Sequence, residues 1–366
     1  MSIEAARKLV ESLDLNIQEG EVGDPYFRDP NVHTFPLNER GFRIIRPVRS
    51  GRRIAFVDGG NQEIMGAPNF SIQLNRVFAG VWDQNERVDV GLPRIEFFSA
   101  TFSNFRNDEI YYDTILVPSV PDFAEYLPNA SDLSFNSMDR SIMNGNQRAD
   151  IERVASIARR FGEWRFAAHV AGVLRKDDVL VMDGTLQTTF VNEGHYLKEL
   201  EEAAMKNGAI LSGLSKSSTL FTTTGLSLLG AVSKLADAAE PDMEWYYPVA
   251  ESTSKDHNVM ILAVKLNTVS ERVFRYELNR EQFNGLGELR LNQVLSELAR
   301  NSSEITLLGY PYGLIDADRF ARVSYDELEY YRGLIASQVS GLGKWQKFSR
   351  YVHASDVHSI LNMLVR

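Results

Sequence analysis

Two short apolar runs that each end in Asp-Gly are the feature that most constrains this chain. Residues 54–60 read IAFVDGG and residues 179–185 read VLVMDGT. Such runs are typical of buried strands, where an unpaired carboxylate is costly. A turn explains one Asp-Gly pair well. Two of them predict that carboxylates meet at strand ends, where a divalent cation would offset their repulsion and glycine would let a metal or phosphate approach the backbone.

The patterns around these runs predict one α/β domain built on a mixed sheet. Residues 70–82 and 94–102 are rich in aromatic and β-branched residues and follow the first run closely, as in an antiparallel meander. Strand patterns then alternate with helical ones, and this order favours a mixed sheet with helices on both faces. Further strands are expected at 209–216, 258–266 and 272–278, and helices at 149–175, 193–207, 291–302, 325–338 and 355–366.

We expect three regions along the chain. Residues 1–38 hold an amphipathic helix pattern and a polar loop, and are a candidate dimer or partner element. Residues 39–338 form the main domain, and residues 339–366 form a helical tail. Within the main domain, residues 103–148 lack a clean period and contain PSVPDF and NASDLSFNSMDRSIMNGNQ, which indicates an insertion there.

Composition excludes several other classes of protein. The 366 residues carry a net charge of −10 and no cysteine. Disulfides, thiolate metal sites and cysteine nucleophiles are therefore excluded, and nucleic acid would have to be bound through a local basic patch or metal ions. No apolar stretch is long enough to span a membrane, and the acidic start MSIEAARKLVESLDL is unlike a secretory signal. We therefore expect a cytoplasmic protein without membrane contact.

The helix expected between the two runs supplies a third acid. In the segment RRFGEWRFAAHVAGVL, Glu163 shares one helical face with the apolar residues at i+3, i+4 and i+7. That face points toward the sheet, so Glu163 is a candidate to join Asp58 and Asp183. The alternative is an ordinary helix salt bridge to Arg159 or Arg160.

A fourth acid is expected in GYPYGLIDADRFARVS (309–324). If a helix begins near residue 314, Asp318 shares its apolar face whereas Asp316 does not, so Asp318 is the better candidate. Three or four carboxylates at one sheet edge can hold two Mg²⁺ or Mn²⁺ ions for attack on a phosphodiester. The pattern therefore predicts metal-dependent phosphodiester hydrolysis, with four candidate ligands: Asp58, Glu163, Asp183 and Asp318.

Five motifs in this chain resemble those of the NurA family of nucleases in order and approximate spacing. They are FVDGG, GEWRFAA, VLVMDGTL, GLSKSS and GYPYGLIDADRFARV, and they span roughly residues 54–324. The resemblance implies a ribonuclease-H-like fold related to the Argonaute nuclease domain, and a DNA nuclease that depends on Mn²⁺ or Mg²⁺. It also implies a homodimeric 5′–3′ exonuclease on single- and double-stranded DNA, with endonuclease action on single strands. Its implied partner is the hexameric ATPase HerA, with which it would resect DNA ends for recombinational repair.

The same resemblance implies roles for individual residues. Asp58 and Asp183 would be metal ligands, with Glu163 as the helix carboxylate between them. Lys216 of GLSKSS would neutralise the scissile phosphate, whereas by itself it reads as an ordinary solvated lysine. The chain departs from the family at Asp318, where many members have histidine. Aspartate can still bind a metal, but the role of the histidine does not carry over.

Two further features have both a functional and a structural interpretation. Four arginines recur every three residues and could follow DNA phosphates, or could be the solvent-facing side chains of a strand pair: Arg43, Arg46, Arg49 and Arg52. The block EWYYP (244–248) offers rings on which unpaired bases could stack. Such aromatic clusters more often belong to a core or an interface.

Two other classes of function stay open at this point. An actin-like kinase or ATPase also places Asp-Gly turns on phosphates, with TTTGLS (222–227) as a phosphate loop. Each Asp-Gly should then belong to a separate half of the protein. A non-catalytic DNA-end-binding accessory subunit would keep the fold without the chemistry, but it would have no need of the full set of acids.

Overall fold

The computed structural model describes residues 3–16, 21–84, 86–344, 346 and 350. The strands are β1 Pro25–Tyr26, β2 Val32–Thr34, β3 Arg43–Ile44, β4 Arg53–Ala67, β5 Phe70–Asp83, β6 Glu86–Val88, β7 Arg94–Arg106, β8 Glu109–Pro118, β9 Ser134–Asn136, β10 Val179–Asp183, β11 Ile210–Ser215, β12 Phe221–Thr222, β13 Trp245–Ser254, β14 His257–Lys265 and β15 Phe274–Asn279. The α-helices are α1 Ile3–Asn16, α2 Ile151–Ala155, α3 Ile157–Val173, α4 Glu193–Asn207, α5 Leu228–Ala239, α6 Arg280–Asn301, α7 Tyr312–Ala321 and α8 Tyr325–Gly341. The helix expected at 355–366, and most of the expected tail, lie outside the described residues.

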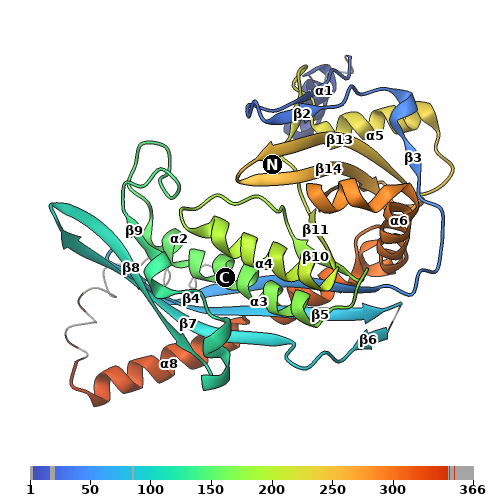
Figure 1. The fold of residues 1–366 in the computed structure, drawn as a ribbon. Helices are drawn as coiled ribbons and strands as arrows, with labels where there is room; N and C mark the ends of the chain where they lie inside the picture. Colours follow the sequence, from blue (N-terminus) through green and yellow to red (C-terminus); the bar gives the residue numbers. More distant parts are fainter. Residues whose placement is uncertain (1–2, 17–20, 85, 345, 347–349, 351–366) are drawn as a thin grey trace.

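One large mixed sheet organises the described part of the chain (Figure 1). Its strand order is β2-β13-β14-β15-β11-β10-β4-β5-β7-β8-β9, with β3 beside β13 and β6 beside β5. At its centre β10 pairs in parallel with both β4 and β11, whereas the other strand pairs are antiparallel. Because β4, β10 and β11 run parallel, all three strands are directed toward the same edge of the sheet.

Helices cover both faces of these central strands, as the sequence predicted. Successive strand residues point to opposite faces. Ala55 and Val57 pack into the core that contains the inner sides of α3 and α4, and Ile54 and Phe56 pack into the core beneath α6 and α7. The ribonuclease-H-like α/β fold expected from the sequence is confirmed.

The long helical pattern at 149–175 and the shorter one at 193–207 are also confirmed, as α2 with α3 and as α4. The end of α4 follows from its sequence. Gly208 takes a left-handed conformation with φ of 69° and its N–H donates to the carbonyls of Ala204 and Met205. Glycine adopts this conformation at little cost, so the helix stops at Asn207.

Residues 103–148, which we expected to be an insertion, begin with regular strand structure, and their status as an insertion stays a prediction. β7 continues to Arg106 and β8 returns from Glu109, so this segment extends the main sheet as a hairpin that projects to one side in Figure 1. The turn residues Asn107 and Asp108 both have positive φ, at 52° and 61°. This two-residue turn matches the twist of an antiparallel pair. Asn-Asp between β-rich runs was therefore the signal for the hairpin.

β4 is longer than its parallel neighbour β10. β10 stops at Asp183, next to the middle of β4, whereas the second half of β4 continues to Ala67 and pairs with β5. Leu328 of α8 and Val323 in the connection before α8 pack on this outer half, in a separate small core with Ile64 of β4 and Leu74 of β5. One strand thus joins the helix-covered centre to the outer part of the sheet.

The described part of α1 leaves large apolar side chains exposed: Ile3, Leu9, Val10 and Leu13. Their exposure agrees with the expectation of a partner or dimer element, which stays a prediction. Within the described ranges, no helix has both the length and the apolar character needed to cross a bilayer.

Candidate active site

The two Asp-Gly pairs meet at the carboxyl edge of the parallel strands. Val57 of β4 is in register with Met182 of β10, so Asp58 and Asp183, the next residues along each strand, lie side by side. Their side chains are only 12% and 11% exposed. The sequence prediction that two carboxylates share one strand edge is therefore confirmed.

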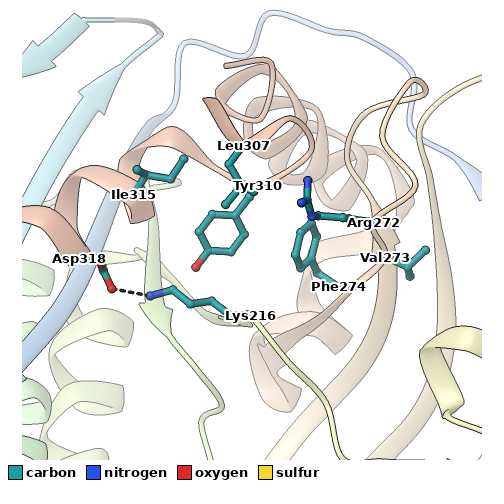
Figure 2. Close-up of a pocket in the computed structure, with 8 residues that line it drawn as sticks. All are labelled: Lys216, Arg272, Val273, Phe274, Leu307, Tyr310, Ile315 and Asp318. Carbon is teal, nitrogen blue, oxygen red and sulfur yellow. Dashed lines mark hydrogen bonds and ion pairs between the residues drawn. The ribbon is translucent and has the colours of Figure 1, made fainter. Parts of the chain in front are cut away.

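A lysine and a third aspartate complete the cluster. Lys216 directly follows β11 and Asp318 lies on α7, which packs against β4 and β5. Nζ of Lys216 is 2.6 Å from Oδ2 of Asp183, 2.8 Å from Oδ1 of Asp318 and 3.8 Å from Oδ2 of Asp58. Figure 2 shows the contact between Lys216 and Asp318. One oxygen from each of Asp58, Asp183 and Asp318 lies within 4.8 Å of the other two.

The choice between the two aspartates of α7 follows the predicted helical face. Asp318 reaches the cluster, whereas Asp316 is buried on another side and pairs with Arg87 at 3.5 Å. Arg87 also lies over the rings of Phe78 and Phe320. Asp316 therefore anchors α7 and takes no part in the cluster.

Glu163 is turned inward, but its carboxylate already has partners. Oε1 contacts the guanidinium of Arg159, and Oε2 lies 3.9 Å from Arg160. The same carboxylate packs against Gly59, beside Asp58. Both interpretations of the sequence thus hold in part: the salt bridge exists, and the acid faces the site. Glu163 is not a member of the three-carboxylate group, so its expected role as a direct ligand is not reproduced in this geometry.

The charges of the cluster shift one another's protonation. Burial, followed by the negative charges of Asp183 and Glu163, raises the pKa of Asp58 to about 8. Burial opposes the charged form of Lys216, but its contacts with Asp183 and Asp318 raise the pKa of this lysine above its usual value. Burial also raises the pKa of Glu163, against the opposing effect of Arg159 and Arg160. The carboxylates of the cluster therefore repel one another, and a bound cation would relieve this repulsion.

The donor set suits a hard divalent cation. Asp58, Asp183 and Asp318 offer carboxylate oxygens, with no nitrogen or sulfur ligand among the three. Oxygen-only sites favour Mg²⁺, Mn²⁺ or Ca²⁺ over softer metals. The cluster therefore fits the kind of metal expected from the sequence, although it does not distinguish among these ions.

The glycines after Asp58 permit close packing, and the access to a metal or phosphate that we expected of them stays a prediction. A Cβ on Gly59 would lie 2.4 Å from Oε1 of Glu163, and a Cβ on Gly60 would lie 2.4 Å from the carbonyl oxygen of Ala321. These two residues let α3 and the end of α7 approach β4 closely.

The arginine run lies at the other end of the central strands. Arg52 is buried, donates to the carbonyl of Asp177 and pairs with its carboxylate at 3.6 Å. This internal ion pair contradicts the expected DNA contact for Arg52. Arg43, Arg46 and Arg49 are exposed, and their DNA-binding role stays a prediction.

The block EWYYP belongs to the core. Its rings Trp245, Tyr246 and Tyr247 lie on β13 and are all buried. They are therefore not available to stack on unpaired bases, and the structural interpretation is confirmed.

Sequence reasoning missed Tyr310, although it lies inside a quoted motif. Its side chain is 1% exposed, and its hydroxyl has no hydrogen-bond partner among the described residues. Burial, and then the nearby charges of Asp183, Asp58 and Asp318, raise its pKa. A tyrosine before proline carries no local signal of this position, because the proximity is created by the fold.

The arrangement contradicts the actin-like kinase interpretation. In that class each Asp-Gly pair should belong to a separate half of the protein. Here Asp58 and Asp183 lie on neighbouring strands of one sheet and contribute to one cluster.

The fold and the site define a ribonuclease-H-like α/β protein with an acidic centre at the carboxyl ends of parallel strands. The profile of the NurA domain matches residues 52–323. The chain therefore belongs to the NurA family of nucleases, as its motifs predicted.

One solved structure agrees with this assignment of the fold, and two others align more weakly. The NurA nuclease from Sulfolobus solfataricus aligns with 93% of this chain and 98% of its own, with a TM-score of 0.51 and 13% identity. Endonuclease V from Ciona intestinalis aligns with 78% of this chain and 89% of its own, at a TM-score of 0.37 and 12% identity. Argonaute from Aquifex aeolicus aligns with 74% of this chain and 28% of its own, at a TM-score of 0.27 and 10% identity. Among curated protein sequences, none gives a significant match.

Proposed function

We propose that this protein is a DNA nuclease that hydrolyses phosphodiesters with a divalent metal, Mn²⁺ or Mg²⁺. The observation that carries the proposal is the convergence of Asp58, Asp183 and Asp318, from two strands and one helix, within 4.8 Å of one another. Membership of a nuclease family gives the reaction class.

Each residue has a distinct role in this proposal. Asp58, Asp183 and Asp318 would hold the cation, which activates water and balances the charge that develops on the phosphate. Lys216, released from these carboxylates, would donate to a non-bridging phosphate oxygen. Glu163 would enter the ligand set, and so support a second ion, only by giving up its contact with Arg159.

The finer features implied by the family resemblance belong to the same proposal. They are 5′–3′ exonuclease action on single- and double-stranded DNA, endonuclease action on single strands, and end resection with a HerA-type ATPase. Homodimerisation is also included, and the exposed apolar side chains of α1 supply a candidate surface for either partner.

The test is cleavage of end-labelled linear DNA. The wild type and Asp58→Asn are incubated with single- and double-stranded substrates while Mn²⁺ and Mg²⁺ are titrated. We expect metal-dependent shortening by the wild type and a loss of at least about 100-fold in the variant, because the ion that stabilises the transition state is displaced.

Absence of cleavage by both proteins, even with the ATPase partner added, would overturn the nuclease proposal. DNA binding without cleavage under these conditions would instead favour the non-catalytic accessory subunit.

A further inference from the structure

Two hollows adjoin the acidic cluster, and they meet at Lys216 and Asp318. Each has a volume of about 520 Å³. One is lined by Asp58, Gly59, Gly60, Asn61, Gln62 and Arg159, among others, and is largely polar. The other, which we call the apolar hollow, is drawn in Figure 2 and is also lined by Lys216 and Asp318.

The apolar hollow has the composition of a small-molecule site. Its walls are Val273, Phe274, Leu307, Tyr310 and Ile315, and Arg272 is exposed beside them. Its volume falls within the roughly 300–1,000 Å³ typical of small-molecule and cofactor sites, which combine apolar walls with a few placed polar groups.

Tyr310 lies where the apolar hollow joins the acidic cluster. Figure 2 shows its ring between Lys216 and Phe274, with the hydroxyl directed toward the side of Lys216 and Asp318. This hydroxyl is buried and lacks a partner among the described residues. The nearest acceptor is the Asp183 carboxylate, with which the hydroxyl interacts but makes no hydrogen bond of normal geometry. A ligand oxygen at the junction would give this buried donor a well-aligned partner.

The lining of the apolar hollow offers phosphate donors, apolar walls and a second cation in the order in which one nucleotide carries phosphate, nucleoside and phosphate. A phosphate needs cationic and hydroxyl donors, which Lys216 and Tyr310 offer at the junction. A sugar and base present a large apolar surface, which suits the walls of the hollow. A phosphate on the far side of that sugar would find Arg272, because arginine binds phosphate oxygens well. The polar hollow lacks such walls and suits a sugar–phosphate backbone.

We propose that the apolar hollow is a nucleoside-binding subsite on one side of the scissile phosphate, with the Tyr310 hydroxyl donating to a phosphate oxygen at the junction. The subsite rests on the proposed nuclease function. The nucleoside on one side of the cleaved bond would be bound in the apolar hollow, whereas the other side would contact only the polar hollow.

Binding of small probes tests the subsite without turnover. Thymidine 3′,5′-bisphosphate and 2-deoxyribose 3,5-bisphosphate differ in the base, and each carries one phosphate for the junction and one for Arg272. Their affinities are measured in Mg²⁺. We expect wild type to prefer the thymidine probe at least fivefold. Ile315→Trp, which fills the hollow, should reduce that preference to below twofold, and Arg272→Gln should weaken binding of both probes. Arg175→Gln, an exposed arginine before β10 at the opposite edge of the sheet, is the matched control and should leave both affinities unchanged.

Equal affinities for the two probes, or no measurable binding of either at millimolar concentration, would overturn the subsite. So would an undiminished preference in Ile315→Trp. Melting temperatures show whether Ile315→Trp is folded, and a single abasic residue in a wild-type substrate gives the second measurement. We expect at least tenfold slower cleavage of the bond on one side of it only, and equal cleavage on both sides would overturn the subsite.

Tyr310→Phe tests the junction. We expect kcat to fall about tenfold, with a smaller change in KM. Tyr276→Phe removes another buried hydroxyl that lacks a partner in the described structure, and it should leave kcat unchanged. Activity of Tyr310→Phe within twofold of wild type would overturn the role of the hydroxyl. Wild-type cleavage of DNA without discrimination between the probes would refute the subsite alone, and probe discrimination without DNA cleavage would refute the nuclease function alone.

Discussion

Nζ of Lys216 lies 2.6 Å from Oδ2 of Asp183, closer than it lies to Asp318 or Asp58. The lysine therefore competes with a divalent cation for the same carboxylate oxygens. We therefore expect a divalent cation bound among these carboxylates to displace Lys216 from them, which would free the ammonium for the substrate phosphate.

Replacement of Lys216 by methionine should separate metal binding from catalysis. We expect Lys216→Met to lower the melting temperature without metal, because repulsion among the carboxylates is no longer offset. The rise in melting temperature on adding Mn²⁺ should be larger than in wild type, while cleavage falls at least about tenfold. Thermal shift and cleavage assays measure these effects, with Lys198→Met on α4 as the surface control. A smaller metal-induced rise than in wild type would contradict this competition.

The two aspartates of α7 should give opposite results. Asp318→Asn should reduce cleavage by at least about 100-fold and weaken the Mn²⁺-induced rise in melting temperature. Asp316→Asn should keep cleavage within about twofold and lower stability, because it weakens the contact with Arg87. Equal loss of activity in both variants would mean that Asp318 has no special place in the cluster.

Glu163 can be distinguished from the three clustered acids by its response to metal. Because its carboxylate is held by Arg159 and lies outside the cluster, Glu163→Gln should retain at least half of the Mn²⁺-induced rise in melting temperature. Asp58→Asn should lose nearly all of it. The comparison uses thermal unfolding with increasing Mn²⁺. If Glu163→Gln loses the whole rise, Glu163 is a direct ligand, as the sequence pattern suggested.

The attachment of α8 should weaken in acid. A hydrogen bond from Arg76 lowers the pKa of Glu327 from its ordinary 4.5 to about 2. Since the folded-state pKa is the lower one, this contact stabilises the fold fully above about pH 4.5, and its contribution is lost as the pH falls through about 2. Glu327→Gln should therefore melt a few degrees below wild type at pH 7, with the difference shrinking by pH 3. A difference that stays constant between pH 7 and pH 3 would exclude this titration.

Much of the site was predictable because its signals are local. The apolar runs before Asp58 and Asp183 indicate two buried strands, and parallel pairing places these aspartates side by side. The expectation that Asp58 ends its strand was wrong, because β4 continues through Gly59 and Gly60 to Ala67. The helical face of Asp318 follows from a repeat of 3.6 residues. These features depend on a few neighbouring residues, which the sequence displays directly.

Other features depend on contacts between distant parts of the chain. Arg52 meets Asp177 across 125 positions of sequence, so no local pattern distinguishes it from the exposed arginines nearby. Tyr310 reaches the cluster only because α6 and α7 pack on one face of the sheet. For Glu163 the pattern indicated the correct direction, but only the packed structure shows that Arg159 holds it.

The unequal lengths of β4 and β10 have a mechanical consequence. Asp58 occupies the point where β4 leaves the support of β10, and the rest of the strand is carried by β5 and α8. Any bending of the outer sheet, for example under the load of a bound partner, would act on Asp58 through a continuous backbone rather than through side-chain contacts. The strand thus connects the outer sheet directly to a carboxylate of the acidic cluster.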